Sequence, residues 1–156
     1  MQPKFLILLV DDDPLLVDIL TRAAQGSFPE AFFIQVFSSS EAITYIQALD
    51  GRGPKLVLLD IDLGAKLNGF DFLAFLRTHD QARFLPVVML TVDDLPSTIG
   101  SAYLMGASSF TVKPASFEGW KTYFATLRLY WFSTVTIPPI RFQKWDYWKP
   151  VESGVE

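Results

Sequence analysis

Short apolar segments alternate along the chain with longer segments in which apolar residues recur every three or four positions. The short segments are rich in β-branched or large side chains, and they are Lys4–Val10, Phe32–Phe37, Lys55–Leu59, Val87–Leu90 and Ser109–Val112. Continuous apolar runs of this length suit strands that are covered on both faces, as in a parallel sheet.

Each short segment is followed by a segment with helical periodicity. Asp13 and Pro14 fit the N-cap and the first position of the first helix, and Ser38 with Glu41 fits a capping box before the second. The other three helices are expected at Phe70–Leu76, Leu95–Met105 and Phe117–Leu129, the last capped by Ser116. Five strand–helix repeats predict an α/β fold: a five-stranded parallel sheet with right-handed crossovers and helices on both faces.

The composition fits one ordinary domain with a full hydrophobic core, because half of the 156 residues are apolar. The net charge of −4 disfavours binding to a nucleic-acid backbone, and the absence of cysteine excludes disulfides and thiolate metal sites. The longest apolar stretch, Leu129–Ile140, contains two prolines and is shorter than the roughly 20 residues that a bilayer requires. We therefore expect a cytoplasmic protein that binds neither nucleic acid nor membrane.

Polar residues gather where the predicted strands end. Asp11 and Asp12 follow the first strand, whereas Asp60, Thr91 and Lys113 end the third, fourth and fifth. In open parallel sheets, ligands bind outside the carboxyl ends of the strands. Three carboxylates brought together would repel one another unless a cation neutralises them, and oxygen ligands of this kind suit Mg²⁺. The set predicts a phosphoryl-transfer site with Asp60 as the nucleophile, stabilised by the metal and by the ammonium group of Lys113.

Each of these residues also has a simpler interpretation when it is taken alone. Acids at a helix N-terminus are stabilised by the helix dipole, which accounts for Asp13 but not for Asp11. Asp60 alone fits a turn, and Lys113 alone fits a surface position. Their joint placement at one sheet edge favours the site. His79 is expected to be a solvated loop residue and neither a phosphohistidine nor a metal ligand.

Four motifs resemble those of the response-regulator receiver family, in the same order and with similar spacing. They are Leu9–Pro14 (LVDDDP), Leu58–Asp62 (LLDID), Leu85–Thr91 (LPVVMLT), and Gly106-Ala107 followed by Lys113-Pro114. The resemblance runs from about Phe5 to Phe132. It implies a doubly wound, flavodoxin-like sheet of strand order 2-1-3-4-5, with a receiver domain over residues 1–132. The remaining residues, 133–156, would be an aromatic-rich C-terminal extension without an output domain.

The resemblance also implies roles for the residues at this sheet edge. Asp60 would be the phosphoacceptor, and Thr91 and Lys113 would bind the phosphoryl oxygens. The ligands of a Mg²⁺ or Mn²⁺ ion would be Asp11, Asp12, Asp60 and the backbone carbonyl of Asp62. The phosphoryl donor would be a sensor histidine kinase. The receiver would catalyse only its own phosphorylation and dephosphorylation, so it would not be an enzyme in the usual sense.

The expected conformational switch involves Thr91, Phe110 and the helix between them. Gly100 lies in the middle of that helix and costs about 1 kcal/mol relative to alanine, so the helix is a natural moving part. We hypothesise that phosphorylation draws Thr91 inward and rearranges the face formed by the fourth helix, fifth strand and fifth helix. Phe110 stands where many receivers have tyrosine, so ring burial would proceed without a hydroxyl group.

Two further departures from the family lie close to Asp60. Leu63-Gly64 replaces the usual hydrophobic residue and proline, and one extra residue precedes Asn68-Gly69, so this loop should be longer and more flexible. Asp62 and Asp93 add acid along the route of the attacking water. They should change the lifetime of the phosphoryl group, in a direction that the sequence does not fix.

Aromatic residues near the C-terminus suggest protein contacts. Interleaved charge and aromatic rings are typical of interface anchors, here Phe142, Trp145, Tyr147 and Trp148. An equally good interpretation is that these rings fold back and cover the last helix. We expect a homodimer through the fourth helix, fifth strand and fifth helix, with Tyr103, Trp120, Tyr123, Trp145 and Trp148 as interface residues, and an unidentified downstream protein. Trp131-Phe132 and Pro138-Pro139 resemble stand-alone regulators that partner phytochrome-type kinases.

Two alternative functions remain at this point. Asp60-Ile61-Asp62 also resembles the nucleophile motif of haloacid-dehalogenase-type phosphohydrolases, but that family places its nucleophile near the start of the chain and its metal-binding acids after the lysine. A pseudo-receiver that only scaffolds partners would not need Asp12, Asp60, Thr91 and Lys113 together.

Overall fold

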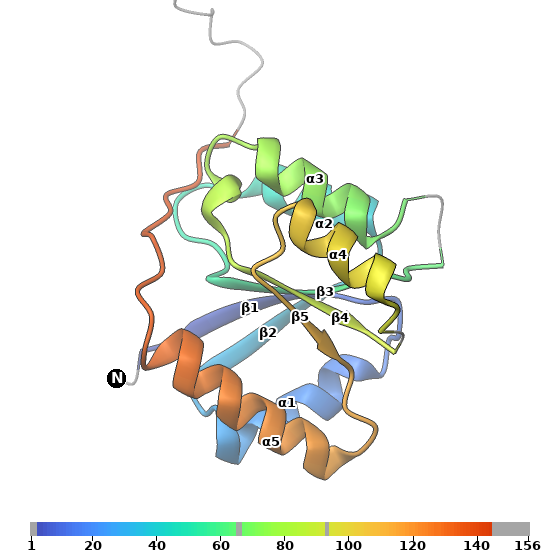
Figure 1. Cartoon of the computed structure of the whole chain (residues 1–156). Helices are drawn as coiled ribbons and strands as arrows, with labels where there is room; N and C mark the ends of the chain where they lie inside the picture. The colour runs from blue at the N-terminus through green and yellow to red at the C-terminus, as the bar shows by residue number, and fades with distance from the viewer. Residues whose placement is uncertain (1–2, 65–66, 93, 145–156) are drawn as a thin grey trace, which may run out of the picture.

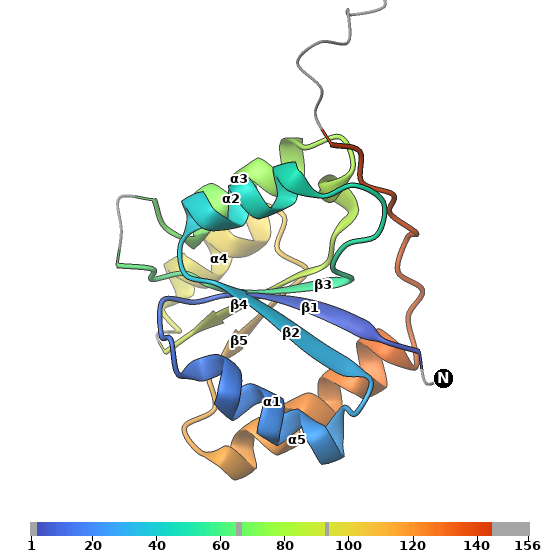
Figure 2. The ribbon, with the colours of Figure 1, turned by 180° about the vertical axis from the view of Figure 1, so that it is seen from behind.

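A five-stranded parallel sheet forms the centre of the protein. The structure is a computed structural model that describes residues 3–64, 67–92 and 94–144. The strands are β1 (Phe5–Val10), β2 (Ala31–Val36), β3 (Leu56–Asp60), β4 (Val87–Thr91) and β5 (Ser109–Val112). Their order in the sheet is β2-β1-β3-β4-β5, which confirms the predicted doubly wound topology (Figures 1 and 2).

The helices cover both faces of this sheet. Helices α1 (Leu16–Ser27) and α5 (Phe117–Leu127) lie on one face, and α2 (Ser39–Ala48), α3 (Gly69–Thr78) and α4 (Pro96–Leu104) lie on the other (Figures 1 and 2). A short 3₁₀ helix, η1 (Ala82–Phe84), precedes β4, and a π-helical segment, η2 (Arg128–Phe132), continues α5. No helix in the described part of the chain is long and apolar enough to span a membrane.

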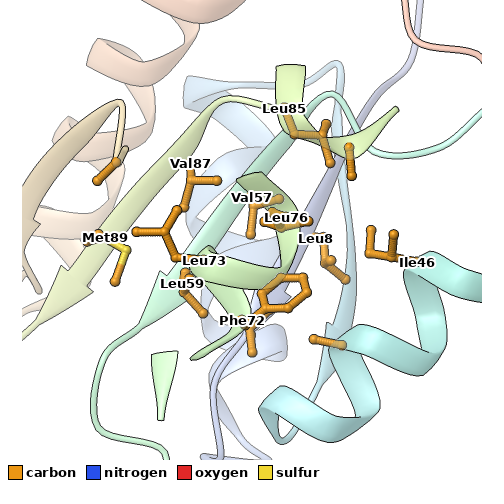
Figure 3. Packing of buried hydrophobic residues seen from close by; sticks show 14 of the residues in the cluster. Leu8, Ile46, Val57, Leu59, Phe72, Leu73, Leu76, Leu85, Val87 and Met89 are labelled. Atoms are coloured by element: carbon orange, nitrogen blue, oxygen red, sulfur yellow. The ribbon is translucent and has the colours of Figure 1, made fainter. Parts of the chain in front are cut away.

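The continuous apolar runs are explained by burial on both sheet faces. Successive side chains of a strand point to opposite faces, so the central strands β1, β3 and β4 supply two separate cores. In the core beneath α2 and α3, strand residues Leu8, Val57, Leu59, Val87 and Met89 meet helix residues Ile46, Phe72, Leu73 and Leu76 (Figure 3). In the other core, Ile7, Leu9, Leu58 and Leu90 pack with Leu20 and Phe124 of α1 and α5.

Side-chain caps define where three of the helices begin, and the predicted cap of α5 is confirmed, since the Ser116 hydroxyl accepts from the Gly119 amide at 3.0 Å. The Ser38 hydroxyl accepts a hydrogen bond from the Glu41 amide at 3.1 Å, as predicted, but the Glu41 carboxylate accepts from the Phe37 amide at 2.7 Å, one residue before the position that the predicted capping box requires. Helix α3 has a full capping box that sequence reasoning missed, since Asn68 Oδ1 accepts from the Asp71 amide at 3.3 Å and Asp71 Oδ2 accepts from the Asn68 amide at 2.7 Å. The first turn of α3 is therefore fixed by two reciprocal bonds.

The first helix begins later than predicted. Pro14 and Leu15 form a turn, and α1 starts at Leu16. Asp13 still satisfies a backbone donor, because its Oδ1 accepts from the Leu15 amide at 3.0 Å. The side chain closes the turn that leads into the helix instead of capping the helix itself.

The tail that follows η2 crosses the amino ends of the strands to the other layer (Figure 1). There Phe142 is 1% exposed and packs in the core beneath α2 and α3. The backbones of Gly51 and Phe142 exchange hydrogen bonds of 2.7 and 2.8 Å. Of the two interpretations of the tail rings, folding back onto the chain holds for Phe142 and the interface anchor does not, but its ring packs in the layer opposite the last helix. Trp145, Tyr147 and Trp148 lie outside the described residues.

Candidate functional site

Strand register brings four of the predicted site residues to the same edge of the sheet. Val10 lies opposite Leu59, so Asp11 and Asp60, the residues that follow them, are level. Thr91 lies opposite Val112, which places Lys113 one residue beyond the end of β4. Asp11 and Asp60 are 1% and 6% exposed, and Thr91 is also buried. The site is therefore a set of polar groups held between two hydrophobic cores.

The ammonium group of Lys113 bridges two buried carboxylates. Its Nζ lies 2.6 Å from Asp11 Oδ2 and 3.1 Å from Asp60 Oδ2. The second oxygen of each carboxylate accepts a backbone amide two residues further on: Asp11 Oδ1 from Asp13 at 2.9 Å, and Asp60 Oδ1 from Asp62 at 3.2 Å. Both carboxylates are thus oriented by one ion pair and one turn, which fixes their geometry before any ligand binds.

Burial makes the negative charge on Asp60 costly. Burial raises the pKa of Asp60, Lys113 lowers it, and the nearby charge of Asp11 raises it; the balance is a pKa of about 6. Burial also lowers the pKa of Lys113, but its hydrogen bond to Asp11 and the charges of Asp60 and Asp11 outweigh burial, so that pKa is raised. Lys113 therefore stays protonated, but its single positive charge does not compensate for the neighbouring carboxylates, since the pKa of Asp60 remains raised.

Three carboxylates converge closely enough to hold a cation. One oxygen from each of Asp11, Asp12 and Asp60 lies within 4.8 Å of the others, and Asp12 is exposed to solvent. This donor set suits Mg²⁺ or Mn²⁺, because Mg²⁺ binds through a few carboxylates and keeps several waters. The charge deficit at Asp60 supports the same conclusion. The predicted fourth ligand, the backbone carbonyl of Asp62, stays a prediction.

The loop after Asp62 is adapted to the acidic cluster. Gly64 has φ of +60°, and a Cβ atom at this position would lie 3.2 Å from Asp12 Oδ2. Glycine therefore allows a left-handed turn close to the Asp12 carboxylate. Leu63 is buried in the core beneath α2 and α3, so it anchors the start of this loop. The predicted extra length of this loop falls partly on residues 65–66, outside the described residues.

Gln35 on β2 holds the acidic loop, and sequence reasoning missed it. Its Nε2 donates to the backbone carbonyls of Asp11 and Asp13 at 2.9 and 2.7 Å. Its Oε1 is buried and has no hydrogen-bond partner among the residues that the structure describes. The only available signal was a single amide in an otherwise apolar strand. One side chain thus ties together both ends of the segment that carries Asp12.

Gly69 brings the start of α3 against the backbone of Asp60. A Cβ atom here would lie 2.3 Å from the Asp60 carbonyl oxygen and 2.9 Å from Ile61 Cα. The Gly69 amide donates to the Ile61 carbonyl at 2.9 Å, and the Ser39 hydroxyl donates to the Asn68 carbonyl at 2.6 Å. No side chain larger than hydrogen fits at position 69 unless the backbone of Asp60 and Ile61 moves.

Of the two expected interface residues on α5, Trp120 is buried and Tyr123 is half-buried. Trp120 is 5% exposed and packs in the core between α5 and the sheet, so it presents almost no surface to a partner. The Tyr123 hydroxyl lies 2.8 Å from Thr111 Oγ1, and burial raises the pKa of Tyr123 to about 12. The expectation that Trp120 is an interface residue is therefore wrong. The apolar stripe of α5 is wide because its rings cover this end of the sheet.

The two expected switch residues, Thr91 and Phe110, differ in position and in burial. Thr91 is buried at the carboxyl end of β4, whereas Phe110 on β5 is half-buried against the core beneath α2 and α3. Tyr103 on α4 is 50% exposed and remains available to a partner. Asp93, Trp145 and Trp148 lie outside the described residues.

His79 has a structural role that differs from the expected solvated loop residue. It is half-buried after α3, and its Nδ1 accepts hydrogen bonds from the amides of Gln81 and Ala82 at 3.2 and 3.1 Å. Its ring also lies against Phe75, with the ring centroids 5.6 Å apart. His79 thus closes the turn that leads to η1.

Comparisons with known proteins agree with this geometry. The family model described as the response regulator receiver domain matches residues 7–123. The chain is similar to the probable methanogenesis regulatory protein FilR2 of Methanothrix harundinacea, with 29% identity over 133 residues that cover 83% of this chain and 85% of that protein. It is 36% identical over 109 residues to the DNA-binding response regulator MtrA of Mycolicibacterium smegmatis, covering 69% of this chain and 43% of MtrA. The chain thus spans less than half the length of MtrA.

Two solved structures share the fold over nearly their full length. The phosphorylated cyanobacterial phytochrome response regulator RcpA superposes with a TM-score of 0.78 at 24% identity, covering 87% of this chain and 99% of that one. The Mn²⁺-bound form of response regulator Rcp1 superposes with a TM-score of 0.75 at 23% identity, covering 88% and 100%. At this identity the likeness concerns the fold.

Proposed function

Because the chain belongs to the response regulator receiver family of two-component systems, we propose that it accepts a phosphoryl group on Asp60 from a phosphohistidine of a sensor histidine kinase. The observation that carries this proposal is the ammonium group of Lys113, which bridges the buried carboxylates of Asp11 and Asp60. A buried acid with no chemical role would not need a lysine that bridges it to a second carboxylate at the edge of the sheet where ligands bind.

The residues around Asp60 divide the chemical work among them. Asp11, Asp12, Asp60 and the Asp62 carbonyl would hold Mg²⁺ or Mn²⁺, which would neutralise charge and coordinate a phosphoryl oxygen. A carboxylate oxygen of Asp60 forms a bond to phosphorus as the phosphorus–nitrogen bond breaks. The imidazole of the kinase leaves with the electron pair of that bond and takes up a proton. Lys113 and Thr91 then donate hydrogen bonds to the transferred phosphoryl oxygens.

The states in which two structural neighbours were solved support this assignment. RcpA was crystallised phosphorylated, and Rcp1 was crystallised with Mn²⁺. In the present chain Asp60 is one of two buried carboxylates of the acidic cluster and ends strand β3, and its raised pKa reflects an environment that favours added positive charge. A bound divalent cation would supply that charge and leave Asp60 ionised, as a nucleophile must be.

Phosphorylation is proposed to act through the face formed by α4, β5 and α5. Tyr103, Leu104 and Val112 are exposed on α4 and β5, and Thr91 is the link from the phosphoryl group to this face. We expect phosphorylated protein to form a homodimer here and to bind a downstream protein. Light scattering at rising concentration, after treatment with acetyl phosphate and Mg²⁺, should give the mass of a dimer. A monomer at every concentration would contradict the proposed dimer.

Intact-mass measurement tests the phosphoacceptor directly. The wild type incubated with acetyl phosphate and Mg²⁺ should gain one phosphoryl group, and chelation of the metal should prevent the gain. The Asp60→Asn variant should gain none, whereas Asp62→Asn, which alters an exposed neighbouring acid, should remain labelled. Equal labelling of wild type and Asp60→Asn would overturn the proposal. Absence of labelling in both would favour the scaffold alternative.

A further inference from the structure

A cavity lies at the end of the sheet opposite Asp60, beneath the C-terminal tail. It has a volume of about 740 Å³ and is bounded by the amino ends of β1 and β2, the segment before β3, η2 and the tail. Its walls are largely aromatic and aliphatic: Phe5, Leu6, Phe32, Trp131, Phe132, Val135, Ile137 and Ile140, with Pro138 and Pro139. Figure 1 shows the tail crossing this edge of the molecule.

Every charged residue in the lining of this cavity is basic. Lys4, Arg52 and Lys55 are exposed, and none forms a salt bridge with any residue that the structure describes. The ammonium groups of Lys4 and Lys55 lie 5.8 and 5.9 Å from the ring centroids of Phe32 and Phe5, which keeps both cations beside apolar surface. Three cations that form no salt bridge among the described residues thus surround one apolar cavity, in a chain with a net charge of −4.

The acidic side chain that precedes β2, Glu30, is already paired with Arg128. Glu30 lies in the loop before β2, and its two carboxylate oxygens accept hydrogen bonds from Arg128 at 2.6 and 2.8 Å. Its backbone carbonyl accepts from the Phe5 amide, so the residue is fixed in this orientation. The positive field of the cavity is therefore not cancelled by Glu30.

We propose that this cavity binds a small organic anion, with a carboxylate, sulfonate or phosphate head and an aromatic or acyl body. The volume falls within the roughly 300–1,000 Å³ that is usual for small-molecule sites. The apolar walls would take up the body, and Lys4, Arg52 and Lys55 would surround the head. A concave site beneath the tail favours a free molecule over the flat surface of a membrane. The site is separate from the carboxyl edge, so its occupancy does not depend on Asp60.

Fluorescence titration with anilinonaphthalene sulfonate tests both parts of this site. The wild type should bind this dye saturably, and the triple variant Lys4→Gln, Arg52→Gln, Lys55→Gln should bind it about tenfold more weakly, since three charge-assisted contacts are lost. The matched control, Arg22→Gln, Arg83→Gln, Lys121→Gln, removes the same charge outside the cavity and should leave the affinity within about twofold. The uncharged analogue phenylnaphthylamine should bind the wild type and the triple variant equally. Asp60→Asn should bind the dye as the wild type does.

A steric variant keeps the test decisive if the triple variant fails to fold. Val135 lines the cavity, and its amide donates to the Tyr130 carbonyl at 2.9 Å, so Val135→Trp should fill the cavity and leave the backbone in place. Native circular dichroism together with lost dye binding would support the proposal, as would displacement of the dye by dodecanoate but not by dodecanol. Equal dye affinity in the wild type and both cavity variants would overturn it. Binding to phosphatidylglycerol vesicles, without binding of dodecanoate, would likewise overturn it in favour of a membrane surface.

Discussion

Asp60 carries a charge that the metal-free protein accommodates poorly, and this has a measurable consequence for stability. Its folded pKa of about 6 lies above the value near 3.9 of an unfolded aspartate. The folded state therefore binds the proton more tightly. The contribution of Asp60 to stability is fully present below about pH 4 and is lost as the pH rises through about 6.

The Asp60→Asn variant should therefore be more stable than the wild type at pH 7.5 in the presence of a chelator. The expected gain is about 2–3 kcal/mol, from a pKa difference of about two units. Urea denaturation of both proteins from pH 4 to 8 would measure it, and the two curves should converge at the acidic end. Asp12→Asn, at an exposed acid, should gain much less. A variant no more stable than the wild type at pH 7.5 would show that Lys113 fully compensates the buried charge.

Gln35 is expected to act on metal affinity through the loop that it holds. Replacing it with leucine removes two hydrogen bonds to the carbonyls of Asp11 and Asp13, so the segment that carries Asp12 loses its fixed geometry. Residues that orient metal ligands without touching the metal typically change metal affinity by about tenfold or more when they are replaced. Calorimetric titration should show Mg²⁺ binding weakened by about tenfold, whereas phosphorylation of Asp60 should recover at saturating Mg²⁺. The control Gln47→Leu alters an exposed glutamine of α2. Unchanged Mg²⁺ affinity in Gln35→Leu would contradict this role.

The residues at the sheet edge could be predicted because each ends an apolar strand. Asp11, Asp60 and Lys113 interrupt runs whose carboxyl ends must meet in a parallel sheet, so position along the chain alone brought them together. Gln35 left no such signal, because its role depends on which strand is the neighbour of β1. Trp120 was misassigned because an aromatic residue on a helix face has the same pattern whether it meets the sheet or a partner.

At the scale of elements, the limits of the strands were predicted more accurately than the starts of the helices. A strand covered on both faces must be apolar throughout, so its limits are marked by the first polar residues. Helix starts depend on local hydrogen bonds that several residue types can make. Asp13 and Asn68 both accept backbone amides, but the first closes a turn before α1 and the second caps α3. Their spacing to the following apolar residues does not distinguish the two cases.

Helix α4 offers a direct test of the proposed switch through Gly100. A Cβ atom at this position would meet nothing within 4 Å, so Gly100→Ala should be accommodated without a clash. Alanine should stabilise the helix by about 0.5–1 kcal/mol, because glycine loses more backbone entropy on folding. If α4 must loosen during signalling, the variant should show a smaller phosphorylation-dependent change in hydrogen exchange across residues 95–110.

Gly26→Ala provides the matched control for that experiment. Gly26 lies in α1, and a Cβ atom there also meets nothing within 4 Å. The substitution should raise stability by a similar amount, about 0.5–1 kcal/mol, while leaving the exchange response of residues 95–110 as in the wild type. If phosphorylation leaves exchange across residues 95–110 unchanged in the wild type itself, α4 is not the moving part.

At the scale of the whole molecule, the path of the tail is the feature that the sequence predicted least. The tail shows no periodicity, and its aromatic residues fitted self-packing and partner binding equally well. The position of Phe142 depends on a gap between α2 and the start of β3 that exists only once the sheet has formed. Gly53 helps to create that gap, because a Cβ atom there would lie 2.5 Å from the Phe142 ring. A contact across such a sequence separation cannot be read from local pattern.

The tail is therefore expected to unfold together with the receiver and not as an appendage that begins at residue 133. Phe142→Ala should lower the free energy of unfolding by about 3–5 kcal/mol, as for other buried phenylalanines, and the urea transition should remain a single step. Phe84→Ala, at an exposed ring, should cost much less. Gly53→Ala should also destabilise the protein, but its cost should not add to that of Phe142→Ala in the double variant, because alanine at 142 removes the ring with which the new methyl group collides. A cost below about 1 kcal/mol for Phe142→Ala, or a separate early transition, would instead place the boundary of the folding unit before the tail.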